Sequence, residues 1–487
     1  LNFVGSGVVA SGTGATKTIT ISGGGSGGTT STSYGASLSG KLATNGTVGT
    51  DNIVIGSNTV NGISEPAPNM AGGATNNILI GVQAGQALTT ADHNTVIGSQ
   101  AGIGISTENY NTLVGSVAGG GANNNSVYNT YLGYSAGYSG GTYTGGGYNT
   151  AVGAFAFNRN YTSTNGRIHN VAIGYGALDS LETGDYNVGI GSYSRTYHGN
   201  SIYNVGVGYG AKTGYVSCVS IGFQAGDSQS SNSNYNTLVG RRAGYDMHGG
   251  DYCTFVGYHA GYAGGSGTSN SGFGTQALYA LTSGAYNSAS GFGALGRLTS
   301  GSRNTAIGLL AGNDGVTSEN STFIGANAGG VYGLTGSYNN VTCLGYQAYP
   351  SSTTVANEIT LGNGSISSLR CQVTSITALS DQRDKTAIED LDLGLNFIKA
   401  MKPRKFTWNR RDGTWHGRKE VGFIAQELHE VEMDFNSTDR TRLVSYENPS
   451  KLEATPMNTY PILIKAIQEL SAQVESLQAR ITKLEGA

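Results

Sequence analysis

The sequence predicts a mainly β fold, in which a repetitive β-solenoid or β-roll shaft precedes a small α+β C-terminal domain that ends in a coiled-coil helix. Three observations support this fold class: a short unit repeated through residues 51–370, a composition of 79 glycines with only 12% charged residues, and a heptad pattern near the C-terminus. Ordinary proteins contain ~7% glycine and ~25% charged residues. This composition therefore excludes an ordinary globular enzyme for most of the chain.

The repeat unit has the form "NTVIGSQAG", "NTLVGSVAG" or "NTAIGLLAG". Anchored on its first glycine, it occurs 18 times between Gly56 and Gly362, most often 17 residues apart. An aliphatic residue or Phe precedes this glycine in 17 units, Ala follows three positions later in 15, and Asn opens 13. The apolar run predicts a brief strand, the glycine a turn that a β-carbon would hinder, and the Asn a turn or a side-chain ladder between coils. A disordered Gly/Ser tract would not keep an apolar residue in register.

Single units of this length cannot bury a face, but stacked units share a continuous core. With Ala, one aliphatic residue and Gly per unit, the burial per coil is small. We therefore expect several chains to pack about one axis as a homo-oligomer. The strict selection of Ala predicts that a backbone or a neighbouring chain lies against that position.

The regions before the repeats are short and differ in texture. "TKTITIS" alternates apolar and polar residues, which predicts a strand pair within residues 1–22, and the Gly/Ser-rich tract that follows is typical of a linker. The predicted domains are an N-terminal β segment (1–22), a linker (23–50), the solenoid (51–370), a connector (371–379), a C-terminal domain (380–459) and a coiled-coil helix (460–487).

Several functions are not expected. The net charge of −3 creates no positive electrostatic potential that would attract nucleic acid. No apolar run reaches the ~20 residues that span a bilayer. We expect no signal peptide, because the sequence from Leu1 shows neither a basic n-region nor an apolar h-region, and the start on Leu suggests that an earlier segment was removed or not included. The four cysteines form no CxxC pair and are expected to be buried thiols, and the seven histidines show no ligand spacing. We therefore expect no metal and no cofactor.

The loops between units carry most of the polar chemistry. Tyrosines in or beside them can stack on sugar faces, or can simply pack at coil edges. These are Tyr110, Tyr128, Tyr143, Tyr148, Tyr186, Tyr203, Tyr235, Tyr286 and Tyr338. Glycan hydrolysis needs two nearby carboxylates, for which Glu182 and Asp185 are the closest candidates, although "LETGDY" is more readily a solvated turn.

From Ser380 the composition becomes that of a globular domain. Residues 380–487 hold 33 of the 57 charged residues and both tryptophans. "AIEDLDLGLNFIKAM" predicts a helix that Pro403 ends, "RKFTW" a strand, and "VGFIAQELHEVE" a strand that runs into a short helix. Apolar residues then alternate at steps of four and three from Leu463 to Leu484, which predicts a coiled coil.

"SDQRDK", "GLNFIKAMKPRKFTW", "VGFIAQEL", "LVSYE" and the terminal heptad helix occur here in an order that resembles the intramolecular chaperone domain of endosialidases and other phage tail spikes. The repeats resemble NTAxGxxA-type repeats of phage tail proteins and, more loosely, the head repeats of trimeric autotransporter adhesins. The chaperone family is trimeric, assembles the fibre that precedes it, and releases itself by a Ser–Lys dyad. The resemblance implies the same here, with no turnover enzyme.

Carried onto this sequence, the resemblance implies that Ser380 is the nucleophile and Lys385 the general base. The cut falls between Leu379 and Ser380, and the matching Asp381 and Arg383 orient or pair locally. The chemistry requires burial of the lysine, which lowers its pKa from ~10.4 towards neutrality. Without the resemblance, "SDQRDK" fits a solvated N-cap of a helix that starts near Thr386.

These features together predict a homotrimeric bacteriophage tail fibre or spike. We expect it to be assembled in the host cytoplasm, incorporated into the virion tail beside other tail proteins, and bound to a glycan on the host cell surface. Two alternatives remain at this point, a polysaccharide depolymerase spike and a non-viral trimeric surface adhesin.

Overall fold

The computed structural model describes residues 52–56 and 73–486 apart from short gaps, and before residue 73 otherwise only the backbone of short strands. The gaps are residues 122, 125, 140–142, 145, 159–166, 180, 197–200, 230–232, 331–334, 373–379, 412–414, 447–448 and 451. The chain divides into two compact units, Leu1–Ser318 and Glu319–Ala487. Each unit is described by itself.

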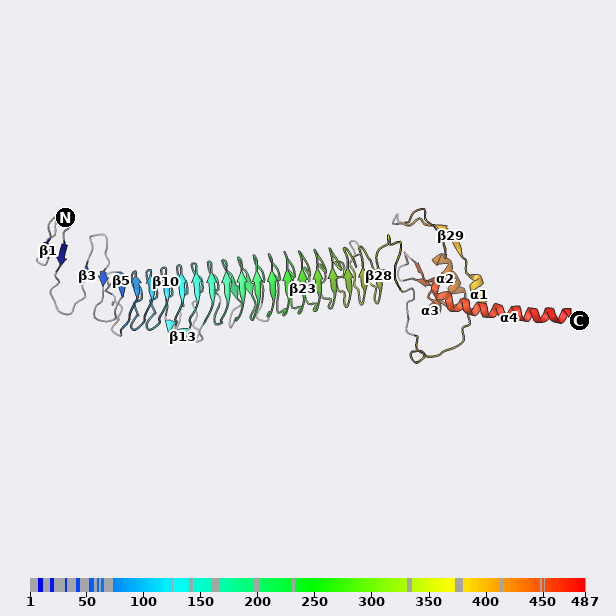
Figure 1. Cartoon of the computed structure of the whole chain (residues 1–487), viewed down its shortest axis with the longest axis horizontal. Helices are drawn as coiled ribbons and strands as arrows, with labels where there is room; N and C mark the ends of the chain where they lie inside the picture. The colour runs from blue at the N-terminus through cyan, green and yellow to red at the C-terminus, as the bar shows by residue number, and fades with distance from the viewer. Residues whose placement is uncertain are drawn as a thin grey trace. The chain divides into compact units, whose positions relative to one another are not determined.

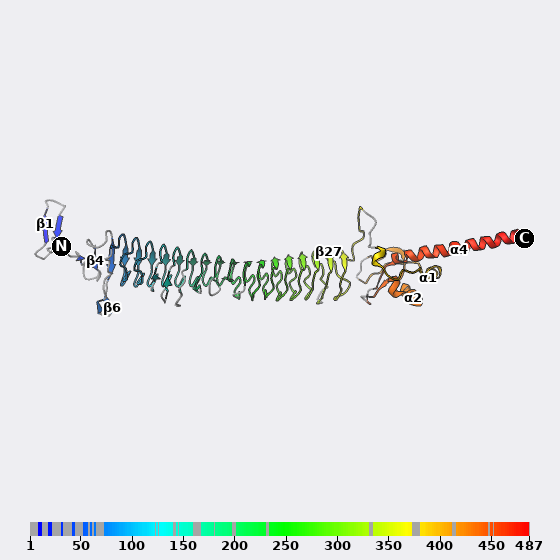
Figure 2. The same ribbon diagram turned by 90° about the horizontal axis from the view of Figure 1, so that it is seen from below.

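The first unit is dominated by a β-solenoid, and the described part of the chain forms about 15 turns of it. Each turn contributes one short strand to a parallel sheet, and Figures 1 and 2 show these strands side by side through the cyan and green part of the chain. Equivalent residues pair across turns, as Thr112 does with Thr130 and Leu113 with Tyr131. The strands are β5 (Ile53–Gly56), β8 (Ile78–Ile80), β9 (Thr95–Ile97), β10 (Thr112–Val114), β12 (Thr130–Leu132), β14 (Thr150–Val152), β15 (Val171–Ile173), β16 (Val188–Ile190), β18 (Val205–Val207), β20 (Val219–Ile221), β21 (Thr237–Val239), β22 (Thr254–Val256), β23 (Ser271–Phe273), β24 (Ser288–Ser290) and β25 (Thr305–Ile307).

Shorter strands accompany the main sheet. In the tract with linker-like composition, β3 (Ser31–Thr32) and β4 (Lys41–Ala43) pair antiparallel and continue onto β5. The first strand pair is antiparallel, between β1 (Val8–Ser11) and β2 (Thr18–Ile21). The remaining pairs are β6 (Thr59–Val60) with β7 (Ile63–Ser64), β11 (Asn123–Asn124) with β13 (Tyr143–Thr144), and β17 (Arg195–Thr196) with β19 (Lys212–Thr213).

The glycine after each main strand is required by its turn. Gly174 has φ +126°, and a Cβ built there would lie 2.7 Å from the carbonyl carbon of Gly191 in the next turn. This conformation is almost restricted to glycine, and the column of stacked glycines leaves no room for a side chain. The predicted role of the glycine is confirmed.

The structure shows which of the two adjacent apolar positions in each unit faces the solenoid interior. The middle residue of each three-residue strand from β8 to β25 is buried, whereas the aliphatic residue just before the glycine is half-buried or exposed. Successive side chains in a strand point to opposite faces, so only one of the two adjacent apolar positions can face inward. The inward-facing residue is therefore the middle residue of the strand, and the residue before the glycine faces outward. The alanine three residues after the glycine is buried inside its own chain, as Ala177 is.

The repeated asparagine forms a buried ladder. Asn187 donates from Nδ2 to the Ser201 carbonyl oxygen at 2.7 Å, and its Oδ1 accepts from Nδ2 of Asn204 at 3.0 Å. Cys218 and Cys253 occupy the same position in their turns, and their thiols are buried. The ladder predicted from the sequence is confirmed, and each rung satisfies backbone groups that would otherwise be buried without partners.

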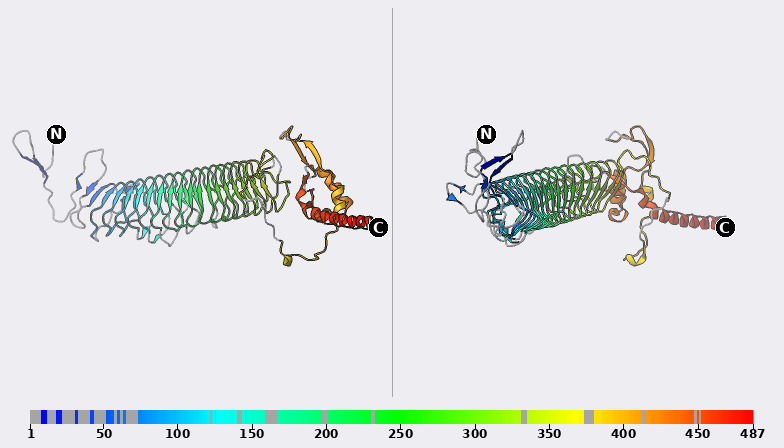
Figure 3. Two further views of the ribbon diagram at one scale, coloured as in Figure 1. Left: turned by 45° about the vertical axis from the view of Figure 1, so that its right-hand side comes forward. Right: turned by 60° about the vertical axis from the view of Figure 1, so that its left-hand side comes forward.

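The second unit begins with three parallel strands and continues into a small α+β region, which Figure 3 shows from two further directions. Its core contains Leu393, Phe397, Met401, Leu428, Val431, Leu443 and Ile462. The elements are β26 (Thr322–Ile324), β27 (Thr342–Leu344), β28 (Ile359–Leu361), η2 (Gln382–Asp384), α1 (Leu395–Ala400), β29 (Arg404–Thr407), β30 (Lys419–Gly422), α2 (Ala425–Asp434), α3 (Thr438–Thr441), β31 (Val444–Ser445), β32 (Glu453–Ala454), η3 (Pro456–Thr459) and α4 (Tyr460–Glu485).

Most of the predicted elements of this region form. The strand in "RKFTW", the strand and helix in "VGFIAQELHEVE" and the long terminal helix are all present. The helix predicted from Ala387 begins only at Leu395, because Ala387 has φ +51° and the Leu395 N–H is capped by the Glu469 carboxylate of α4 at 2.7 Å. Among the described residues, no helix combines the length and apolarity needed to cross a membrane.

Candidate functional site

The candidate site is the segment Ser380–Lys385, which contains the 3-10 turn η2. Asp381 precedes this turn in an extended conformation, and its carboxylate accepts a hydrogen bond from the Arg383 N–H at 2.8 Å. Lys385 follows the turn and is extended again. The segment therefore reverses direction within six residues.

This reversal brings the two predicted catalytic side chains into contact. Lys385 Nζ lies 2.6 Å from Ser380 Oγ and 3.4 Å from the Ser380 carbonyl oxygen. The alternative prediction, a helix that starts near Thr386, is wrong, because residues 386–394 form no helix. Asp381 does act as a cap, but of η2 only.

Asp381 and Arg383 form the supporting pair. The Asp381 carboxylate accepts from Arg383 Nε at 3.0 Å and from a terminal guanidinium nitrogen at 2.6 Å. The side-chain hydrogen bond from Arg383, followed by the one from its backbone N–H, lowers the pKa of Asp381 below its usual value. The pair therefore holds the turn in one shape while Asp381 is ionised.

Ser380 and Lys385 are both exposed in the single chain. A protonated lysine donates to a serine hydroxyl and cannot take its proton, and burial is what makes a lysine available as a base. The contact supplies the geometry of a nucleophile and a base, but the surroundings that would activate the lysine are not provided by these residues alone. Leu379, on the other side of the predicted cut, lies outside the described residues.

The comparison with protein families concerns this same part of the chain. Residues 380–437 match the family model described as the chaperone of endosialidase. The match starts at Ser380 itself, and with the solenoid that precedes it the chain has the architecture of a phage tail spike. No curated protein gives a significant match to the chain. Of the segments that carried the sequence resemblance, "SDQRDK", "GLNFIKAMKPRKFTW" and "VGFIAQEL" lie within this match and are confirmed; residues 380–437 are hereafter the chaperone region.

The predicted tyrosine sites of the solenoid form a ladder on its surface. His93, Tyr110, Tyr128, Tyr148, His169, Tyr186 and Tyr203 stack in turn, with ring centroids 4.8–5.2 Å apart. Tyr235 stacks on Tyr252 in the same way, and Tyr286 is exposed. Because most ring faces are covered by neighbouring rings, this ladder mainly presents ring edges and hydroxyl groups to solvent.

One tyrosine differs from that prediction, and the side chain of another lies outside the described residues. Tyr338 is buried, with its ring 5.9 Å from that of Phe323, so it packs in the interior and offers no surface for a ligand. Tyr143 lies in β13, but its side chain is outside the described part of the structure.

Acidic residues of the solenoid take part in the contacts between turns. Asp185 accepts from the Ile168 N–H of the preceding turn at 2.9 Å, and Asp92 accepts from the Thr75 N–H at 2.6 Å. Glu182 is exposed. Within the described residues, no group of three His, Cys, Asp or Glu side chains is placed to hold a metal ion.

Proposed function

We propose that the chain is a subunit of a homotrimeric bacteriophage tail fibre or spike that binds a glycan on the host cell surface and is assembled by its own C-terminal chaperone. The match of residues 380–437 to the chaperone of endosialidase, directly after a β-solenoid, carries this proposal. On this proposal the shaft is assembled in the host cytoplasm, joins other tail proteins and functions in the virion.

The outward-facing residues of the solenoid support a homotrimer. The residue before the repeat glycine is aliphatic or Phe in 17 of 18 units. Yet this residue lies on the outside, and Ile190, Ile221 and Ile307 are 37%, 39% and 49% exposed. An apolar stripe of this length is rare on a monomer and marks a surface for association. A second copy presents the same stripe with the same spacing.

The terminal helix α4 gives independent support. Its heptad residues from Leu463 to Leu484 are exposed, and Ile467 is 65% exposed in the single chain. An apolar seam on a long helix is stable when another helix covers it. Ile and Val at one seam position and Leu at the other nominally favour two strands, so on this proposal the chaperone region before the helix sets the trimer.

The oligomeric state of the full-length protein tests this assembly. Wild type should sediment at the mass of three chains, whereas a double variant Ile190→Glu and Ile221→Glu should lose the trimeric shaft because it places charges in the stripe. Ser300→Glu, which adds a charge at an exposed turn position, is the matched control and should remain trimeric. A wild-type protein that sediments as a monomer would overturn the proposal.

Self-cleavage at the chaperone region is the second part of the proposal. Lys385, once buried in the assembled trimer, accepts the proton of Ser380 Oγ, and the oxygen attacks the carbonyl carbon of Leu379. The peptide C–N bond breaks, its nitrogen gains a proton, and the acyl group moves to Ser380 Oγ as an ester. Water then hydrolyses the ester, which leaves Ser380 as the new N-terminus. The 2.6 Å contact between the two side chains supports this assignment.

Denaturing gels and N-terminal sequencing test the cleavage. Wild type should release a fragment that starts at Ser380, and Ser380→Ala and Lys385→Ala should release none. Lys385→Arg keeps the positive charge but cannot act as a base at neutral pH, so it should also remain uncut. Release of the same fragment from Ser380→Ala, or no fragment from wild type, would contradict the mechanism.

A further inference from the structure

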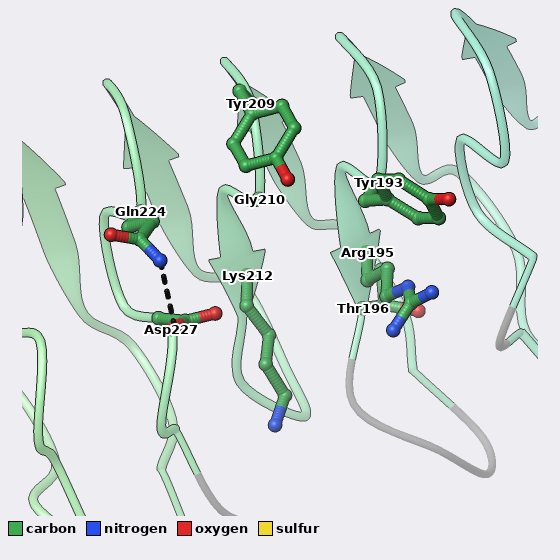
Figure 4. Close-up of a pocket in the computed structure, with 8 residues that line it drawn as sticks. All are labelled: Tyr193, Arg195, Thr196, Tyr209, Gly210, Lys212, Gln224 and Asp227. Atoms are coloured by element: carbon green, nitrogen blue, oxygen red, sulfur yellow. Dashed lines mark hydrogen bonds between the residues drawn. The ribbon is translucent and has the colours of Figure 1, made fainter.

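A polar pocket of about 410 Å³ lies over the strand pair β17–β19 of the first unit, and Figure 4 shows its lining side chains. Pockets that bind small ligands fall in the range of about 300–1,000 Å³. Its walls include Tyr193, Arg195, Tyr209, Lys212, Gln224 and Asp227.

The pocket exists because two adjacent repeats depart from the pattern at one position. The residue four after the repeat glycine is a second glycine in many units, and it is charged only at Arg195 and Lys212. The register of β17 and β19 pairs these two residues directly across neighbouring turns. Two cationic side chains therefore stand side by side where most turns have no side chain or an apolar one.

A carboxylate pairs with Arg195, and the charge of another carboxylate, Asp227, acts on Lys212. Arg195 Nε lies 2.9 Å from Asp179 Oδ1, and a terminal nitrogen of Arg195 lies 3.0 Å from Asp179 Oδ2. Burial lowers the pKa of Lys212; the charge of Asp227 opposes this effect and that of Arg195 adds to it. Two cations beside two carboxylates leave the pocket without net charge, so it has no preference for an anion.

The pocket combines aromatic walls with hydrogen-bonding groups of both kinds. Tyr193 and Tyr209 meet edge-on with centroids 6.2 Å apart, and Tyr209 is exposed. Arg195 and Lys212 carry donors, Asp227 carries acceptors, and the Gln224 amide donates to Asp227 at 3.5 Å. Hydroxyl groups can both donate to a carboxylate and accept from a cation, and charge-assisted hydrogen bonds are the stronger ones. Tyr209 also stacks on Phe223, with ring centroids 5.4 Å apart, and the ring surface that stays exposed is apolar and can contact the C–H face of a sugar.

We propose that this pocket binds one neutral sugar unit of a glycan chain. The inference rests on the proposed glycan-binding function and assigns it a site and a ligand class. Tyr209 contacts the sugar ring, and Arg195, Lys212 and Asp227 bond its hydroxyl groups.

Binding of defined oligosaccharides to the full-length protein tests the inference. The probes are neutral oligosaccharides of glucose, galactose, mannose and rhamnose, with oligogalacturonate and oligosialate as acidic probes. At least one neutral probe should bind, and both Tyr209→Ala and Asp227→Asn should weaken that binding about tenfold or more, the loss of one charge-assisted hydrogen bond or stacking contact. Tyr252→Ala removes a tyrosine of the ladder that does not line the pocket and is 62% exposed, against 52% for Tyr209, and this variant should bind like wild type. Matching thermal unfolding of all variants would assign the loss to the pocket.

Each other outcome overturns the inference in a different way. If a neutral oligosaccharide binds and neither pocket variant weakens that binding, the assigned site is overturned and the glycan-binding function stands. Binding of acidic probes alone would overturn the ligand class. No binding to any probe would overturn the pocket assignment together with the proposed glycan function.

Discussion

The solenoid turns of residues 73–318 and the segment Ser380–Lys385 use polar side chains in opposite ways. In the solenoid, asparagines such as Asn187 are fully buried, and each bonds the turns on both sides of it. In that segment, the hydrogen bonds found among the described residues join Ser380 to Lys385 and Asp381 to Arg383, and Ser380, Arg383 and Lys385 are exposed. The asparagine ladder is therefore bonded within one chain, whereas the Ser–Lys contact of the single chain is exposed to solvent.

Removing residues 380–487 should have the largest effect, because near-identical repeats can pair out of register and, in the proposed trimer, need one nucleus to align the chains. We expect a chain without residues 380–487 to give aggregated or monomeric protein, measured by size-exclusion chromatography with light scattering.

The control for this deletion is the double variant Ser380→Ala and Lys385→Ala. It keeps the chaperone region attached and should assemble as wild type does, because only cleavage is blocked. A deletion that yields the same trimer as wild type would show that the solenoid aligns itself.

Within the solenoid, the repeat glycines should be the least tolerant positions. Gly174→Ala forces an alanine to φ +126° and places its Cβ 2.7 Å from the Gly191 backbone. We expect a loss of about 3–5 kcal/mol in the free energy of unfolding, measured in denaturant.

Gly176→Ala is the matched control in the same turn. Its φ is +58°, a value that Phe155 and Tyr193 adopt two residues after their own repeat glycines, and the nearest atom to the new Cβ is 3.3 Å away. We expect a loss of about 1 kcal/mol. Equal losses in the free energy of unfolding for the two variants would contradict a close backbone contact between the stacked repeat glycines.

The asparagine ladder should rank next. Asn187→Ala removes the donor to the Ser201 carbonyl and the acceptor for Asn204, which leaves buried groups without partners. We expect a loss of about 2–3 kcal/mol in the free energy of unfolding. Asn187→Cys should lose less, because the Cys253 thiol donates to the equivalent carbonyls of Asp251 and Gly267 at 3.4 and 3.3 Å. An alanine variant as stable as wild type would deny the ladder any role in stability.

The sequence was sufficient to predict the solenoid, because its repeat encodes local requirements of one chain: a strand, a glycine turn and an asparagine rung. It was not sufficient to tell which of two adjacent apolar residues faces inward. Both Val96 and Ile97 suit a core, and only the structure shows Val96 buried and Ile97 facing outward.

The same limit applies to the site. The motif "SDQRDK" identified the side chains that the structure brings into contact, because their partners are only a few residues apart. The pocket over β17 and β19 was missed, although its signal was present in Arg195 and Lys212 at a position that is otherwise uncharged. Its walls come from turns whose alignment fixes which side chains meet, and that alignment is a property of the fold.

The smallest expected effect concerns the thiols. Burial raises the pKa of Cys253 to about 11 and that of Cys343 to about 12, whereas Cys371 is exposed. At pH 8, iodoacetamide should modify Cys371 in the native protein and the buried thiols only after unfolding, as read by mass spectrometry of the peptides.

The unfolded thiols ionise near pH 9 and the folded ones at higher pH, so the unfolded state binds fewer protons between these values. Stability should therefore be intact below about pH 9 and fall as the pH rises towards 12. Rapid labelling of Cys253 in the native protein would show that the solenoid interior opens to solvent, and would contradict this prediction.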